Sequence, residues 1–214
     1  MSKVKLLATT GGGSTSLEGP NSTTANANVS WQLPVADGSN GQVLTTNASG
    51  QLAFSDVAAG GKILQLISAT KTDQFSATTE DAWTDITGLS VAITPSATSS
   101  KILFRAMVVV GTNVSDAVPA LRVLRDSTAI GIGDAAGGRG RASGAMNVAH
   151  DWVAESVPID IVDSPSSTSE LTYKVQYYKS QSPTIYINSS YRDADSSGID
   201  FRYSSVVYVM EVGA

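Results

Sequence analysis

The chain of 214 residues contains no cysteine and only one histidine, His150. Without thiols it can form neither disulfides nor thiolate metal sites, so its stability must come from packing, hydrogen bonding or subunit association. Charged residues are also scarce, at 15% of the chain, and the net charge is -5. Because binding to a phosphate backbone needs clustered Lys and Arg, this composition argues against nucleic acid as a partner.

Long apolar runs are absent as well. The longest, residues 106–110, is far shorter than the roughly 18 residues of a membrane-spanning helix, so we expect no membrane insertion. The N-terminal residues 1–8 begin like a signal peptide, but Thr9, Thr10 and Gly11 interrupt the apolar segment before it is complete. This interruption argues against Sec-dependent secretion.

The residues that are abundant favour strands and turns. Hydrophobic residues make up 42% of the chain, enough for a buried core, and Ser, Thr, Gly, Ala and Asn dominate the remainder. Many apolar runs after residue 60 alternate with period two, and turn-forming Asp, Ser, Pro and Gly separate them. We therefore predict an all-β chain with an antiparallel, jelly-roll-like β-sandwich over residues 61–214. The expected strands are 62–69, 89–94, 101–111, 120–125, 128–132, 145–155, 157–162, 170–179, 184–188 and 204–212.

Residues 1–60 have a different texture, which predicts an extended N-terminal anchor and stalk. From residue 31 onward, strands of three to five residues recur between turns, each with one or two large apolar side chains. Such a segment cannot offset its own loss of backbone entropy, so we expect three copies to bury these side chains around a three-fold axis. The predicted trimer and anchor interface comprises Trp31, Leu33, Val43, Leu44, Leu52 and Phe54. The alternative is a flexible linker that merely contains apolar residues.

No catalytic, cofactor or metal site is predicted. His150 precedes Asp151, but neighbours on a strand point to opposite faces, so Asp151 could not orient the imidazole. Residues 131–136 fit a dinucleotide-binding pattern, yet the Gly- and Arg-rich residues 137–144 predict a loop where a helix is required. Arg139 and Arg141 of this loop are candidates for ligand contact.

Acidic residues supply two weaker alternatives. Asp193, Asp195 and Asp200 could offer oxygens to Ca²⁺, but their spacing does not match an EF-hand, and turn formation explains them more simply. Asp160 with Asp163 could form a glycosidase pair, which nothing else in the sequence favours. Tyrosines gather near the C-terminus, and Tyr191 and Arg192 are further candidates for a ligand-contact loop.

The chain resembles phage tail-fibre and virion appendage proteins over nearly its whole length. The N-terminal residues that carry this resemblance are 9–13, 31–34 and 41–46, which resemble the leader of such proteins. Residues 61–65, 91–95, 99–103, 124–133, 163–165, 172–176 and 185–188 resemble a fibre head domain. The resemblance implies a virion location, trimeric assembly, attachment through the N-terminal part and a sandwich displayed outward. It implies no catalytic residues.

These observations together predict a non-enzymatic phage structural protein at the surface of the virion. Its expected partners are copies of itself, other virion proteins through residues 1–60, and a glycan or protein of the host surface. A capsid or tail decoration protein with a purely structural role is the alternative. A free bacterial lectin or hydrolase would need a secretion signal and a polar pocket, and the sequence indicates neither.

Overall fold

A computed structural model describes residues 3–7, 14–18, 31–47, 49, 51–57, 61–180, 182–195, 198 and 200–214, with the backbone alone for the first two ranges. The chain divides into two compact units, Met1–Ala58 and Ala59–Ala214. The described ranges contain strands and turns but no helix. Accordingly, no helix of sufficient length and apolarity to cross a membrane occurs among them.

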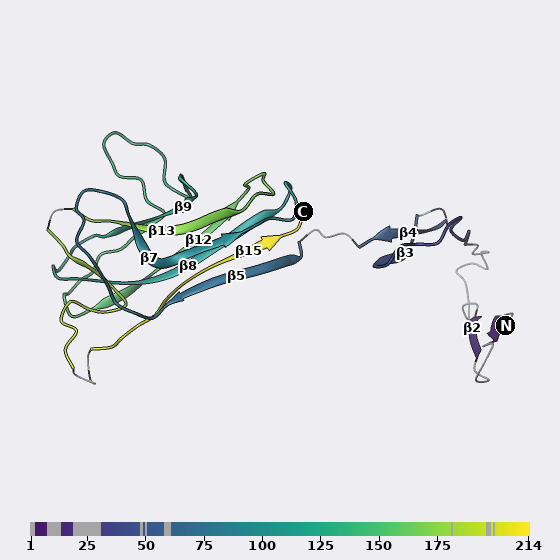
Figure 1. Ribbon diagram of the computed structural model, residues 1–214, viewed down its shortest axis with the longest axis horizontal. Coiled ribbons are helices and arrows are strands. Elements are labelled where there is room, and N and C mark those ends of the chain that lie inside the picture. Colours follow the sequence, from purple (N-terminus) through teal and green to yellow (C-terminus); the bar gives the residue numbers. More distant parts are fainter. Residues whose placement is uncertain are drawn as a thin grey trace, which may run out of the picture. The chain divides into compact units, whose positions relative to one another are not determined.

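Two antiparallel hairpins form the regular structure of the first unit (Figure 1). The first pairs β1 (Lys3–Leu7) with β2 (Ser14–Glu18), and the second pairs β3 (Gln42–Thr46) with β4 (Leu52–Asp56). An isolated two-stranded hairpin is marginally stable in water. Each hairpin therefore needs further contacts to persist.

The second unit contains a large antiparallel sheet, here called the β8 sheet. Its central strand is so long that β15 pairs with its first half and β14 with its end, while β12 runs along its other side. The sheet is completed by β5 beside β15 and by β6 beside β14. Its strands are β5 (Ile63–Lys71), β15 (Ser205–Val212), β8 (Lys101–Thr112), β12 (Ala154–Asp163), β14 (Ile185–Ile187) and β6 (Phe75–Ala77).

The facing antiparallel sheet, here called the β13 sheet, is ordered β7-β13-β9-β10, with β11 also pairing with β9. Its strands are β7 (Thr84–Ile93), β13 (Leu171–Tyr178), β9 (Ala120–Arg125), β10 (Thr128–Ile130) and β11 (Gly144–Ala145). The sandwich closes on one side where β5 meets β7 and on the other where β12 meets β11. Numbered along the chain, the eight principal strands are ordered 1-8-3-6 and 2-7-4-5, which is a jelly-roll arrangement.

The core lies between the two sheets and follows from strand alternation. Phe104 of the β8 sheet and Tyr173 of the β13 sheet are fully buried, with their ring centroids 6.1 Å apart. Among the described residues, every buried side-chain nitrogen and oxygen has a hydrogen-bond partner. Residues from both sheets line the core, including Ile86, Leu89, Val91, Ile93, Ile102, Ala106, Val108, Val110, Leu121, Val123, Val157, Ile159, Val175, Tyr177, Val207 and Val209.

The predicted all-β sandwich is confirmed, but one predicted strand is wrong. Residues 146–153 connect β11 to β12 without forming a strand, and a turn closed by the Val153 N–H donating to the His150 carbonyl lies at their end. Val148 is nevertheless fully buried. Apolar residues from an irregular segment enter the core here, and sequence alternation alone cannot distinguish that from a strand.

Strand β7 begins at Thr84, earlier than the predicted start at residue 89. The pairing with β13 shifts register between Lys174 and Gln176, and Gly88 adopts a φ of 90° opposite this shift. Glycine tolerates such a left-handed conformation, so the strand passes through a bulge and continues. Alternation across residue 88 is broken, which hides the first half of the strand in the sequence.

Candidate functional site

The β3–β4 hairpin carries four of the six predicted interface residues, but not on one face. Leu44 lies opposite Phe54, and Thr46 lies opposite Leu52. Because side chains alternate along a strand, Leu44, Leu52 and Phe54 share one face of the hairpin. Val43 belongs to the other face, which it shares with polar side chains.

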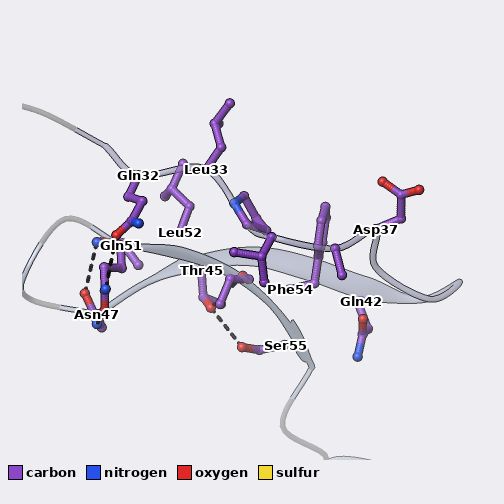
Figure 2. Close-up of a pocket in the computed structure, with 15 residues that line it drawn as sticks. Gln32, Leu33, Asp37, Gln42, Thr45, Asn47, Gln51, Leu52, Phe54 and Ser55 are labelled. Carbon is purple, nitrogen blue, oxygen red and sulfur yellow. Dashed lines mark hydrogen bonds between the residues drawn. The ribbon is translucent and has the colours of Figure 1, made fainter.

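Residues 32–37 run along the hairpin and form with it an open groove of about 560 Å³ (Figure 2). The Leu52 N–H donates to the Gln32 carbonyl at 2.8 Å, and the Gln51 side-chain amide donates to the Gln32 side chain at 3.1 Å. At the other end, a Cβ on Gly38 would lie 2.5 Å from the Phe54 ring. The turn at residues 37–38 therefore packs directly on that ring, and only glycine fits there.

The large apolar side chains of this unit remain in contact with solvent. Trp31 is 68% exposed, Leu33 73% and Phe54 41%. Figure 2 shows Leu33 pointing away from the hairpin strands. Val43 is 44% exposed and Leu44 53%, so Leu52 alone among the six predicted residues is partly buried. Within one chain, the large apolar side chains of this segment do not pack into a buried core.

The candidate loop residues Arg139 and Arg141 lie in the long loop between β10 and β11. The Arg141 Nε–H donates to the Gly133 carbonyl at 2.6 Å, and Arg139 donates to the Ala136 carbonyl at 3.2 Å. Both guanidinium groups thus bind the backbone of their own loop. Both residues remain exposed, so part of each guanidinium is still available to a partner.

Tyr191 and Arg192 lie in the connection between β14 and β15, on a different loop. Tyr191 is 48% exposed and its ring centroid is 5.7 Å from that of Tyr186. Arg192 makes an ion pair with the buried Asp200 carboxylate at 2.7 Å, which raises the pKa of Arg192 chiefly through this hydrogen bond. The structure therefore holds Arg192 in place beside an exposed tyrosine.

Sequence reasoning missed the aromatic residues beside Tyr191. The Tyr191 N–H donates to the Asp151 carbonyl at 3.1 Å, which brings the turn at residues 150–153 alongside. In that turn the His150 and Trp152 rings stack with centroids 4.4 Å apart, and Trp152 is 49% exposed. The prediction of a strand over these residues concealed the turn. The signal available in the sequence was a tryptophan directly after the His-Asp pair.

The acidic alternatives separate in the structure. Asp160 pairs with Arg105 on the outer face of the β8 sheet. Asp163 points inward, where it accepts from Arg125 and from the buried Tyr173 hydroxyl, each at 2.7 Å. The two carboxylates thus serve opposite faces of β12 and do not converge as a glycosidase pair would.

The acidic loop before β15 is likewise bound to arginines. Asp193 pairs with Arg202 at 2.6 Å and Asp200 pairs with Arg192, while residues 196, 197 and 199 lie outside the described residues. No cluster of three potential metal ligands occurs in the described part of the chain. Residues 131–143, which contain the dinucleotide-like pattern, form a loop without a helix.

Comparisons with known proteins give no family for this chain. No family model matches it, and no curated protein matches it. A solved structure of infectious bursal disease virus, Gt strain, is 16% identical over 76% of this chain and 40% of its own, with a TM-score of 0.38. The VP2 subviral particle of the same virus is 15% identical over 81% of this chain and 43% of its own, with a TM-score of 0.36.

The chain therefore spans about two fifths of the length of these two viral proteins. At such identities and TM-scores, neither similarity bears on the family or function of this protein.

Proposed function

We propose that this chain is a non-enzymatic structural protein of a bacteriophage virion, a subunit of a short trimeric appendage. Residues 1–60 attach it to the particle and the sandwich of residues 61–214 is displayed outward. The observation that carries the proposal is the unit of residues 31–57, whose large apolar side chains are exposed in a single chain.

Association with identical copies supplies what this unit lacks. The Leu44, Leu52 and Phe54 face, together with Trp31 and Leu33, offers apolar surface that three copies bury against one another. Polar contacts already satisfy the hairpin ends, since Asn47 Oδ1 accepts from the Gln51 N–H at 3.1 Å. The apolar face of Leu44, Leu52 and Phe54 is thus left for association.

The test is the mass of the purified full chain by light scattering. We expect a monodisperse species of three times the 22.1 kDa chain mass. Phe54→Asp should abolish it at micromolar concentration, because burying an unpaired carboxylate near a three-fold axis is strongly unfavourable. Ser49→Asp adds the same charge at an exposed turn of the same unit and should leave the trimer intact. A monomeric wild-type chain would refute the proposal.

Host attachment is the second half of the proposal, and two aromatic pairs on segments joined by a backbone hydrogen bond support it. They are His150 with Trp152 and Tyr186 with Tyr191. Exposed aromatic faces beside a fixed arginine suit amphipathic ligands such as glycans. Trimerisation would present three such sites and raise the overall avidity. A glycan array probed with the full chain tests for this binding.

A decoration protein without a host ligand remains the competing candidate, because a short stalk with a sandwich serves either role. Gold labelling of the protein on particles, imaged by electron microscopy, separates the two. A position at the tail tip favours attachment, and a regular distribution over the capsid favours decoration.

A further inference from the structure

The two outer faces of the sandwich differ sharply in chemistry. On the β13 sheet, the outer face is covered by a bonded polar network. The Arg122 Nε–H donates to the Gln176 side-chain oxygen Oε1 at 2.8 Å, and the Gln176 side-chain amide donates to Asp85 at 2.6 Å. Lys174 also pairs with Asp85, at 2.7 Å. This face is well suited to water.

The outer face of the β8 sheet is mostly apolar instead. Strand register places Leu66, Met210, Leu103 and Val162 in one row across β5, β15, β8 and β12. Leu66 is 60% exposed and Val162 69%. A second row, four residues further along each strand, consists of Thr70, Val206, Met107 and Pro158. The row between them consists of Ser68, Tyr208, Arg105 and Asp160.

The charged groups between these rows neutralise each other. Arg105 of β8 and Asp160 of β12 are paired in the register and form an ion pair. The Arg105 guanidinium also lies 6.0 Å from the ring centroid of Tyr208. The centre of the face therefore carries no net charge, which disfavours a strongly charged partner and suits a second copy of the same neutral surface.

The area of this face also indicates what kind of partner can bind it. Four strands about 4.8 Å apart and three side-chain rows about 7 Å apart give a footprint of roughly 400 Å². A stable interface between free proteins buries about 800 Å² on each side, so this face is too small to hold an independent partner tightly. A tethered partner needs less area, because tethering raises its effective concentration to the millimolar range.

The chain itself provides the tether. Strand β5 begins at Ile63, only six residues after Val57, and six residues span at most about 21 Å. When residues 31–57 of three copies associate, their sandwiches are held within a short reach of one another. Ile63, Leu64 and Leu66, all exposed, stand at the start of the sandwich, directly after this tether.

We propose that in the trimer the outer face of β5, β15, β8 and β12 packs against the sandwich of a neighbouring copy. This inference rests on the proposed trimer and adds the surface by which the heads meet. The contact is between faces and not between strand edges, because Pro158 on the edge strand β12 lacks the N–H that strand addition would use.

Single thiols test this contact cleanly, since the chain contains no cysteine of its own. Val162→Cys places a thiol on the apolar face, and Ser90→Cys places one on the outer face of the β13 sheet. Both residues are exposed and both lie on edge strands, so they form a matched pair. Leu66→Cys gives a second position on the apolar face in case Val162→Cys perturbs folding.

The measurement is the rate of maleimide labelling of the full chain, normalised to the rate in denaturant, with the mass of each variant recorded. We expect the thiols at positions 162 and 66 to react at least about tenfold more slowly than the thiol at position 90. A contact worth 1.4 kcal/mol leaves the face open about a tenth of the time.

The outcomes separate the two proposals. A trimer in which all three thiols react equally fast overturns the covered face and leaves the trimeric appendage standing. A monomer overturns the trimer and the covered face with it. Protection of position 162 that arises only on intact particles would assign the face to another virion protein and also overturn the inference.

Discussion

At the scale of single residues, Glu211 is the most constrained ionisable group of the sandwich. It is fully buried on β15 and has no cationic partner among its hydrogen bonds. Its Oε1 accepts from the Ser96 N–H, the Ser96 hydroxyl and the Ser100 hydroxyl, and its Oε2 accepts from the Gln65 amide. The carboxylate thereby ties the turn at residues 94–100 to strands β5 and β15.

Glu211→Gln should destabilise the chain by about 1–3 kcal/mol, because in either orientation the new NH₂ group faces another hydrogen-bond donor. If its NH₂ replaces Oε2, it meets the Gln65 amide, which the Thr94 carbonyl holds in place at 2.8 Å. If its NH₂ replaces Oε1, it meets the Ser96 N–H, which cannot rotate. Urea denaturation measures the difference, and the exposed Glu170→Gln is the control. Equal stability of the two variants would contradict this role.

The same site predicts a pH dependence. Burial raises the pKa of Glu211, but hydrogen bonds from Ser100, Ser96 and Gln65 outweigh burial and lower it from 4.5 to about 2. A carboxyl group whose pKa is lowered on folding stabilises the folded state above its unfolded pKa, and this contribution is lost as the pH falls toward the folded value. The stability gap between wild type and Glu211→Gln should therefore be full above about pH 5 and shrink between pH 4.5 and 2. A gap that stays constant on acidification would be inconsistent with this linkage.

At the scale of elements, Gly111 on β8 marks the point where three segments cross. A Cβ at this position would lie 2.4 Å from the Ser189 carbonyl oxygen and 3.3 Å from the Val153 carbonyl oxygen. Gly111→Ala should therefore force the backbone segments apart and cost about 1–3 kcal/mol. Gly133→Ala, with no atom within 4 Å of its Cβ, is the matched control. The two denaturation midpoints measured on the full chain decide the matter, and coincident midpoints would rule out this crossing as a constraint.

Regular alternation of buried and exposed residues decides which elements could be predicted from the sequence. Strands such as β8 and β15 alternate regularly, and apolar period-two patterns identify them without further information. In contrast, Gly88 bends β7 through a bulge, and residues 146–153 bury Val148 without forming a strand. These features depend on contacts between segments distant in sequence, which local patterns do not encode.

The candidate sites were likewise predictable only in part from the sequence. The apolar composition of residues 31–57 was legible in the sequence, whereas the separation of Val43 from Leu44, Leu52 and Phe54 required the hairpin register. The neighbouring positions of Trp152 and Tyr191 and the polarity difference between the two outer faces arise only from tertiary pairing. Neither of these two features can be predicted from alternation along a single strand.

At the scale of the whole molecule, the two proposed contacts should depend on each other in one direction. The hairpin unit assembles first because it has no core of its own, and the sandwich face, with its small area, closes only when tethering brings copies together. In a Phe54→Asp background, the thiol introduced by Val162→Cys should therefore label as fast as the one introduced by Ser90→Cys. By contrast, Val162→Arg should open the heads while light scattering still reports a trimer. The reverse pattern, with monomers from Val162→Arg and a persistent trimer from Phe54→Asp, would make the sandwich face the primary assembly contact and the hairpin unit a passive connector.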